Sequence, residues 1–427
     1  MRIVIATQSL AGLGGSESYA ITVADQLQRL GHCVWLFALD LGRSSETAKA
    51  LGLPVTDSSS ALPDDIDALI VQDGAVACEL AARYPLTPQL FVAHSDIFDL
   101  QLPPQVEGLL AAVVTLYERV DKRIRAMALQ VPVVELRQPI DVERFKPLSP
   151  IRGLPRVALA LSYYINDTRL DLLIEACEKA GIELRTNSIR GEKPTPTPEL
   201  VYNEADIVFG KARVILEAMA CGRAAFVFDH NGSDGWVTAE NAARLAADNF
   251  GGQDEFRPLD AASIAAELTN YDPLMGTNNR DFIVANHAAS AHAAELVDVL
   301  RSLAPRTQTV DAPLNELARM VRNYHRADSA EFALRAERHH LTTQIGNLEQ
   351  QRAQLEQQSA QLEQQRARLA AELEQASDHA AAISERAEAA ERRENEMLQT
   401  RRWQLTQAAL RPLDKLRQLK ANRSGRP

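Results

Sequence analysis

Residues 209–222 read FGKARVILEAMACG, and this stretch decides how the chain is interpreted. An apolar run ends, two cations follow at Lys211 and Arg213, and the spacing of apolar residues then predicts a helix over 212–221. Cations beside the N-terminus of a helix favour a diphosphate. Glu217 lies one turn into the helix, where its carboxylate can accept hydrogen bonds from ribose hydroxyls. The alternative is an ordinary amphipathic helix with a solvated Glu217.

Strands and helices alternate on both sides of this stretch, which predicts an α/β fold with doubly wound, mostly parallel sheets. Strand-like runs lie at 2–6, 34–38, 68–71, 90–93, 111–115, 131–136, 157–161, 182–185, 207–209 and 225–229, and helical patterns at about 16–30, 168–180, 212–221 and 284–303. The alternation breaks where Pro and Gly cluster at 138–155. We therefore expect two domains facing a cleft, 1–140 and 141–305, with ligands at the carboxyl ends of the strands.

A glycine-rich turn, GLGGSE at 12–17, separates the first strand from its helix. Glycines at positions 14 and 15 allow a ligand to approach the backbone closely, and the N–H groups of a helix start favour a phosphate or a polar ligand. The pattern is an incomplete GxGxxG, because Glu17 occupies the third glycine position. The alternative is a tight turn with Ser16 as the N-cap. A second segment, 229–238, follows the strand after the Glu217 helix and either touches the donor or is a surface loop.

Four segments together resemble the group-1 glycosyltransferases. They are GGSE at 14–17, HSD at 94–96, QPIDVERFKP at 138–147 and LEAMACG at 216–222, and the resemblance covers roughly residues 1–305. It implies a GT-B fold of two Rossmann-like domains and a retaining transfer of a sugar from a nucleotide-sugar donor. It also implies that no cofactor and no metal are required.

The resemblance also implies roles for individual residues. Gly14 and Gly15 would face the donor phosphates and the acceptor, His94 would line the acceptor side near the donor sugar, and Glu217 would hold the ribose. His94 and Glu217 are thus the expected catalytic residues. Without the resemblance, a lone histidine such as His94 is an ordinary polar residue of a cleft.

The chain departs from the family pattern at two places. The family signature is Glu-x7-Glu, and Phe209 takes the position of the first Glu, which contacts the transferred sugar. The family also carries a cation where this chain has Thr168, with Arg169 beside it. We expect Lys211 and Arg213, together with Arg169, to bind the donor phosphates instead.

The region from 314 to 400 predicts a coiled coil. One stripe of Leu341, Leu348, Leu355, Leu362 and Leu369 continues as Ala376, Ile383, Ala390 and Met397 without a slip in the heptad register. The companion stripe is mostly polar or small, so we expect a moderately stable homo-oligomer. No proline occurs between Leu314 and Arg411, and an uninterrupted helix over that region would span roughly 150 Å.

Charge is distributed unevenly along the chain. The formal net charge is −11, which argues against nucleic acid as a partner, and residues 1–313 carry −14. Residues 401–427 carry +7, with Trp403 and several leucines between the basic residues and Pro412 interrupting the helix. This tail suits an anionic membrane surface; a basic, frayed end of the coiled coil is the alternative.

The remaining composition predicts a cytoplasmic protein. Four cysteines are scattered without CxxC spacing, the N-terminal residues form a strand rather than a signal peptide, and no apolar run reaches about 20 residues. We expect a glycosyltransferase that acts on a glycan or lipid-linked acceptor in bacterial surface-polysaccharide synthesis, peripheral on the inner face of the membrane. The alternatives are a catalytically weakened binding subunit tethered by the coiled coil, and a spacer in which the globular part only anchors the arm.

Overall fold

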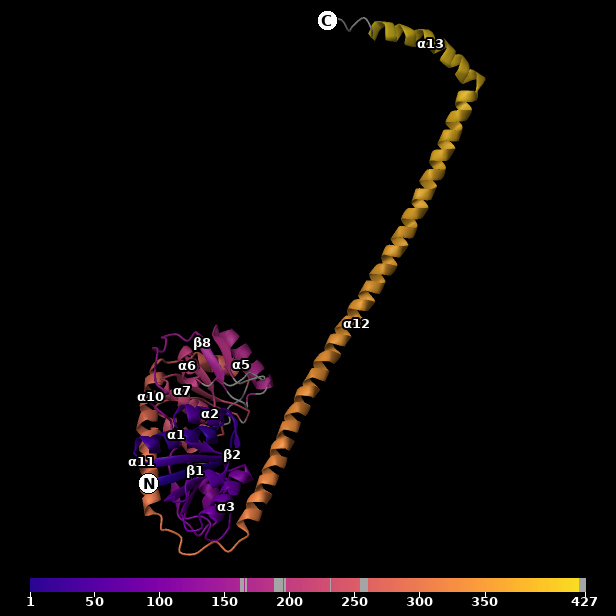
Figure 1. The fold of residues 1–427 in the computed structure, drawn as a ribbon. Helices are drawn as coiled ribbons and strands as arrows, with labels where there is room; N and C mark the ends of the chain where they lie inside the picture. Colours follow the sequence, from indigo (N-terminus) through magenta and orange to yellow (C-terminus); the bar gives the residue numbers. More distant parts are fainter. Residues whose placement is uncertain are drawn as a thin grey trace. The chain divides into compact units, whose positions relative to one another are not determined.

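The computed structural model describes residues 1–161, 165, 167–187, 195, 197–230, 232–253 and 260–421. The chain divides into two units, Met1–Ser329 and Ala330–Pro427. The first unit contains two α/β sheets and the start of a long helix, and the described part of the second consists of the rest of that helix and one further helix (Figure 1).

The first domain is built on a seven-stranded parallel sheet with the order β3-β2-β1-β4-β5-β6-β7. Its strands are β1 (Arg2–Leu10), β2 (Cys33–Leu41), β3 (Val55–Thr56), β4 (Ala68–Val71), β5 (Gln89–Ala93), β6 (Ala112–Thr115) and β7 (Val133–Glu135). Its helices are α1 (Gly15–Arg29), α2 (Arg43–Ala50), α3 (Gly74–Arg83) and α4 (Glu118–Ala126), with short 3-10 turns at Ser59–Ala61 and Asp99–Gln101.

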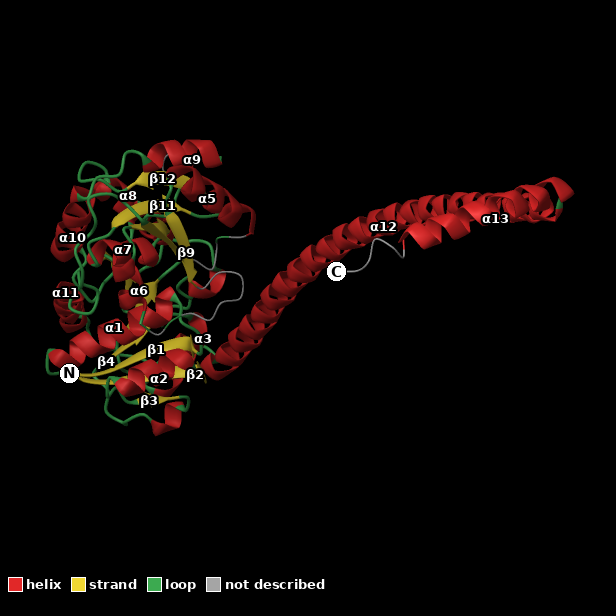
Figure 2. Cartoon of the chain, turned by 90° about the horizontal axis from the view of Figure 1, so that it is seen from above, coloured by secondary structure: helices red, strands yellow, loops and turns green. Residues whose placement is uncertain are grey.

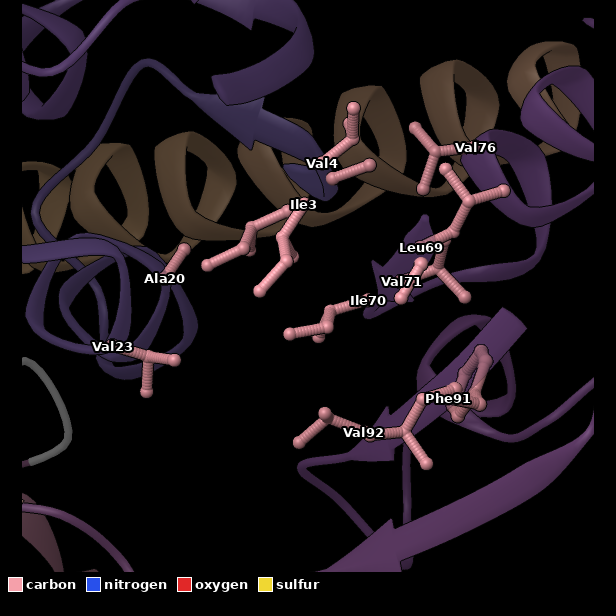
Figure 3. Close-up of a cluster of buried hydrophobic side chains, with 14 of the residues drawn as sticks. Ile3, Val4, Ala20, Val23, Leu69, Ile70, Val71, Val76, Phe91 and Val92 are labelled. Atoms are coloured by element: carbon pink, nitrogen blue, oxygen red, sulfur yellow. The ribbon is translucent and has the colours of Figure 1, made fainter. Parts of the chain in front are cut away.

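The core of this domain explains why its central strands are almost wholly apolar. Ile3 and Val4 are successive residues of β1, so they point to opposite faces of the sheet, yet both are fully buried. Figure 3 shows them among aliphatic side chains from α1, α3, β4 and β5. Helices therefore cover both faces, as the doubly wound pattern predicted.

The second domain has a five-stranded sheet with the order β12-β11-β10-β8-β9 (Figure 2). Its strands are β8 (Val157–Leu161), β9 (Glu183–Asn187), β10 (Ile207–Gly210), β11 (Ala224–Phe228) and β12 (Ser233–Trp236). Its helices are α5 (Asp167–Ala180), α6 (Pro198–Glu204), α7 (Arg213–Ala220), α8 (Ala242–Ala247), α9 (Ala261–Leu268) and α10 (Leu274–Asn286). The two sheets confirm the predicted fold class, two Rossmann-like domains in a GT-B-like arrangement.

Two alternatives that the sequence left open are excluded by the structure. The segment 229–238 is not a surface loop, because β12 pairs antiparallel with β11 and its residues are buried; Asn231 lies outside the described residues. Ser16 is not the N-cap of α1, since the helix begins at Gly15 and Gly14 is its cap. The Ser16 hydroxyl instead donates to the Glu17 carboxylate at 2.9 Å.

The helix predicted near 284–303 is two helices. α10 ends at Asn286, and α11 (Ala289–Ser302) packs with buried Leu296 and Leu300 into the core of the first domain. Between the helices, the Ile140 N–H donates to the His287 carbonyl at 2.7 Å, and the Ala289 N–H donates to the Ile140 carbonyl at 2.9 Å. The chain thus crosses between the domains twice, and the two crossings are hydrogen-bonded to each other.

The predicted long C-terminal helix is present but differs from the prediction at two points. α12 (Leu314–Gln399) and α13 (Arg401–Ala421) are separated by Thr400, so the predicted single helix is interrupted once. Pro412 lies inside α13 rather than breaking it. The leucine stripe from Leu341 to Leu369 is exposed on the single chain. In the described part of the chain, no helix combines the length and apolarity needed to span a membrane.

Candidate functional site

A pocket of about 460 Å³ lies between the two domains of the first unit. The carboxyl ends of parallel strands face it, as expected for doubly wound sheets. Six of the seven predicted site residues line it, namely Gly14, Gly15, His94, Lys211, Arg213 and Glu217. Arg169, near the start of α5, is not among the lining residues; the neighbouring positions 162–164 and 166 lie outside the described residues.

The N-terminus of α1 opens directly onto this pocket. Gly14 caps the helix with extended backbone and has no side chain that could accept from the first N–H groups. A Cβ on Gly14 would lie 2.3 Å from Oε2 of Glu17, so a larger residue at this position would displace that carboxylate. The loop therefore presents free backbone donors to the cleft, which is the arrangement that binds anions at helix starts.

The turn from β10 into α7 is short and strained. Only Lys211 and Ala212 connect the two elements, and Ala212 has φ 49° and ψ −126°. Its N–H donates to the carbonyl of Phe250 at 3.1 Å. Among the described residues, four non-glycines have positive φ, and three of them, Ala212, Asn249 and Phe250, meet here. Strain of this kind persists where the surroundings enforce it, typically at binding sites.

Arg213 and Glu217 form an ion pair on the wall of the pocket. The guanidinium Nε donates to Oε1 of Glu217 at 2.7 Å, and the Tyr202 hydroxyl donates to Oε2 at 3.1 Å. Burial, the largest effect, and the nearby Glu217 carboxylate raise the pKa of Tyr202, so its phenol remains a donor. Arg213 also reaches the hydroxyl of Thr22 in the first domain at 3.4 Å. Both carboxylate oxygens of Glu217 are therefore occupied in this state.

Lys211 is paired in a similar way. Its Nζ lies 2.6 Å from Oδ2 of Asp229, a carboxylate with no exposed surface at the end of β11. The lysine side chain itself keeps 17% of its surface exposed in the pocket. The cation is thus positioned by a buried counter-charge while its ammonium group still reaches the cleft.

Arg119 of the first domain holds two carboxylates at the pocket. Its guanidinium lies 3.0 Å from Asp96 of the same domain and 2.6 Å from Asp248 of the second. A further hydrogen bond of 2.9 Å joins it to Gln253. Burial raises the pKa of Asp248, and Arg119 opposes that shift. This cluster is a polar link across the cleft.

His94 presents an uncharged imidazole to the cleft. Burial is the main cause that lowers its pKa to about 3, with Arg213 and His292 adding to the effect. Its ring lies edge-on to Tyr19 with centroids 4.9 Å apart. Among the described residues, Nε2 of His94 is buried without a hydrogen-bond partner. A neutral histidine with one unsatisfied nitrogen is suited to a hydroxyl group of a ligand.

Phe209 does not face the cleft. It is fully buried in β10, with its ring 5.3 Å from Phe226 and 6.4 Å from Phe228. The strand continues to Gly210, so position 209 lies within the sheet and not in the turn before α7. The departure from the Glu-x7-Glu signature therefore places an aromatic core residue at this position.

No family model matches the chain. No curated protein matches it either. Several solved structures share the fold. One is Anabaena Alr3699/HepE with UDP and glucose, which has a TM-score of 0.49 and 13% identity over 71% of this chain and 100% of that one. A second is an alpha-glucosyltransferase with UDP and DNA, with a TM-score of 0.49 and 13% identity over 71% of this chain and 100% of that one. A third is a putative UDP-N-acetylglucosamine 2-epimerase from Listeria monocytogenes, with a TM-score of 0.48 and 11% identity over 71% of this chain and 96% of that one. At these scores they carry no functional argument, and the activity is inferred from the cleft itself.

Two features of the site were not found from the sequence. Arg119 and Asp248 are 129 residues apart, and neither lies in a recognisable motif, although Asp96 belongs to the HSD segment. Nothing in the residue pattern signals the backbone of Ala212. Among the described residues, no three His, Cys, Asp or Glu side chains are arranged to hold a metal ion.

Proposed function

We propose that the cleft binds a nucleoside diphosphate sugar and that the chain transfers the sugar to a hydroxyl group of a glycan or lipid-linked acceptor. One observation carries this proposal. In a chain of net charge −11, the uncapped N-termini of α1 and α7 open onto one pocket that also holds four cations, Arg119, Arg144, Lys211 and Arg213. Helix N-termini and cations together favour a diphosphate.

Donor binding would exchange one ion pair for another. The diphosphate attracts Arg213, which leaves Oε1 of Glu217 free to accept hydrogen bonds from the ribose diol. Tyr202 continues to hold Oε2, so the carboxylate keeps its orientation. Lys211, anchored on Asp229, adds a second cation at the start of α7.

The same groups would stabilise the leaving group during transfer. As the bond between the sugar C1 and the phosphate oxygen breaks, negative charge develops on the diphosphate, where fixed cations and helix dipoles stabilise it most. Neutral His94 would hold a sugar hydroxyl through Nε2 and take no proton at neutral pH. The resemblance implies that the acceptor attacks from the face that the diphosphate leaves, with retention of configuration and without a metal.

A thermal-shift series with UDP, GDP, ADP and CDP tests the donor site. We expect one nucleotide to raise the melting temperature, and Arg213→Ala to abolish that shift. Arg185→Ala is the matched control, because Arg185 makes exposed ion pairs on β9 away from the pocket. If no nucleotide shifts the wild-type chain, or if Arg213→Ala responds fully, the proposed donor site is wrong.

The runner-up is a binding subunit that has lost most of its activity. Phe209 favours it, because the position that contacts the transferred sugar in related enzymes belongs to the core here. The two functions differ in turnover: a transferase releases nucleoside diphosphate from its donor when the acceptor is present, and a binding subunit binds the nucleotide without releasing product.

The C-terminal region would place this activity at a membrane. We propose that the exposed leucine stripe joins copies of the chain, and that the basic residues of 401–427 attach the oligomer to anionic lipid during surface-polysaccharide synthesis at the cytoplasmic face. Deleting 401–427 should abolish co-sedimentation with phosphatidylglycerol vesicles. Equal binding with and without these residues would instead support the frayed coiled-coil end.

A further inference from the structure

A second pocket, of about 380 Å³, lies beside the cleft in the first domain. It is bounded by the carboxyl ends of β1 and β4, by the segment after β5, and by Tyr324, His325 and Asp328 of α12. Its volume falls within the range of about 300–1,000 Å³ that is usual for small-molecule sites. Four residues line both this pocket and the cleft, namely Ser16, Ile97, Phe98 and Gln101, so the two are contiguous.

The start of α12 is fixed against the first domain, which makes it a stable wall. Leu314 and Ala318 are buried in the domain core. Arg322 lies 3.4 Å from the carboxylate of Glu79 on α3, and Val321 packs near Gly74. The residues of α12 that face the pocket follow directly after these anchors, within the same compact unit.

Buried amides without partners line this pocket. Gln72 is only 2% exposed, and among the described residues neither its amide oxygen nor its amide nitrogen has a hydrogen-bond partner. Oε1 of Gln8, a residue only 6% exposed, is also unsatisfied. Burying such groups without partners is unfavourable, so the unsatisfied amides of Gln8 and Gln72 point to a ligand that forms hydrogen bonds with them. An amide offers both donors and an acceptor, which matches adjacent hydroxyl groups.

The charge of this pocket is opposite to that of the cleft. Its lining contains the carboxyl groups of Glu17, Asp73, Asp99 and Asp328 and, among the described residues, no lysine or arginine. An anionic ligand would be repelled. Tyr324 and Phe98 are both more than half exposed and add aromatic surface beside the polar groups. Amides, carboxyl groups and aromatic rings together suit a neutral or amino-bearing polyhydroxylated ring.

We infer that this pocket binds a neutral or amino-bearing sugar, and that the start of the C-terminal arm selects it. Assigning that sugar to the acceptor rests on the function proposed above, because the pocket continues from the cleft. The binding of the sugar itself does not depend on that function. The arm then contributes a wall of the substrate site in addition to joining copies of the chain.

Saturation-transfer NMR on the full chain tests this inference. The probes are methyl α-D-glucopyranoside, N-acetylglucosamine, glucosamine and glucuronate, each at millimolar concentration, with UDP observed in the same samples. We expect saturation transfer to at least one neutral or amino sugar and at least tenfold less to glucuronate. Gln72→Met and Tyr324→Ala should each reduce the sugar signal at least fivefold and leave the UDP signal unchanged. Met320→Ala, an exposed change on the same helix outside the pocket, is the control.

The outcomes separate the two proposals. No signal from any neutral or amino sugar, an equal signal from glucuronate, or a sugar signal that survives both variants would overturn the inference even if UDP binds. A sugar signal without a UDP signal would support the proposed sugar pocket and contradict the proposed donor site. Gln72→Met should melt at or above the wild-type temperature, because the replaced amide has no partner. If it melts lower, the amide is structural, and Tyr324→Ala alone decides.

Discussion

The hydroxyl group of Tyr19 donates a hydrogen bond of 2.9 Å to Nε2 of His292. The direction of this bond follows from the other ring nitrogen, since Nδ1 of His292 lies 2.9 Å from the Arg137 carbonyl, which can only accept. The two residues are 273 positions apart, and the bond ties α11 to α1. The ring of Tyr19 also packs against His94, so α11 holds a residue of the cleft in place through Tyr19.

Replacing Tyr19 by Phe should destabilise the first domain but keep the aromatic ring that packs against His94 in the cleft. The change leaves Nε2 of His292 buried without a donor, which costs roughly 1–3 kcal/mol, and keeps the ring against His94. Urea unfolding measures the loss. Tyr271→Phe is the matched control, because its hydroxyl donates to the Arg152 carbonyl at an exposed position where water can substitute. Equal stability of Tyr19→Phe and wild type would contradict the assigned bond.

Acid should destabilise the chain between pH 6.5 and about 4. Burial lowers the pKa of His94 to about 3 and those of His287 and His292 to about 4, so below pH 6.5 the unfolded chain binds protons that the folded chain excludes. Each histidine removes up to about 1.4 kcal/mol per pH unit. Asp73 acts with the opposite sign, because burial raises its pKa to about 6 and the folded chain takes up that proton first.

The measurement is the urea midpoint as a function of pH. Three histidines offset by Asp73 should lower the free energy of unfolding by roughly 3 kcal/mol for each pH unit of acidification. His287→Asn keeps a donor for the Gln138 carbonyl and removes one titrating group, so its curve should be shallower. A wild-type curve that is flat from pH 6.5 to 4.5 would show that these rings do not stay neutral.

Introducing the Glu-x7-Glu pattern with Phe209→Glu should unfold the second domain rather than increase activity. The ring is fully buried between Phe226 and Phe228. Losing it costs about 3–5 kcal/mol, and the buried carboxylate adds to that cost. Phe209→Leu, the control, should cost less than about 2 kcal/mol. A folded Phe209→Glu variant with higher turnover would mean that this position reaches the cleft.

The exposed leucine stripe of α12 predicts a self-associating chain. Leu355 and Leu362 are about two-thirds exposed on the single chain, and burial against a partner helix would stabilise both. Light scattering should give a multiple of 47.0 kDa for the wild type. Replacing both leucines with Asn should return the mass to 47.0 kDa, whereas the paired control Gln357→Asn and Gln364→Asn should not. A monomeric wild type would refute the coiled coil.

The sequence predicts local structure well wherever periodicity or a turn residue specifies it. Buried parallel strands such as Ala68–Val71 are continuous apolar runs, and the α1 and α7 helices begin shortly after a glycine. The leucine repeat likewise predicts the helix from Leu341 to Leu369, where the leucines are exposed on the single chain. These features depend on neighbours within a few residues, which is the information a linear pattern holds.

Contacts between distant segments could not be predicted in this way. Residues 289–302 have an ordinary amphipathic pattern, and nothing in it distinguishes the core of the first domain from that of the second. The Arg119 cluster joins charges from α4, the segment after β5 and the end of α8, each of which reads as a solvated surface residue by itself. Gln72 becomes notable only once its burial and its missing partners are known.

The paired crossings at Ile140 and Ala288 limit how the two domains can move. A single connecting segment would allow rotation about several axes, but two segments joined by hydrogen bonds resist twisting and leave bending as the soft motion. Arg119 of the first domain and Asp248 of the second form a further link between the domains, an ion pair of 2.6 Å at the cleft. A ligand that exchanges this ion pair for its own contacts would therefore change one of the few links that hold the two domains at a fixed angle.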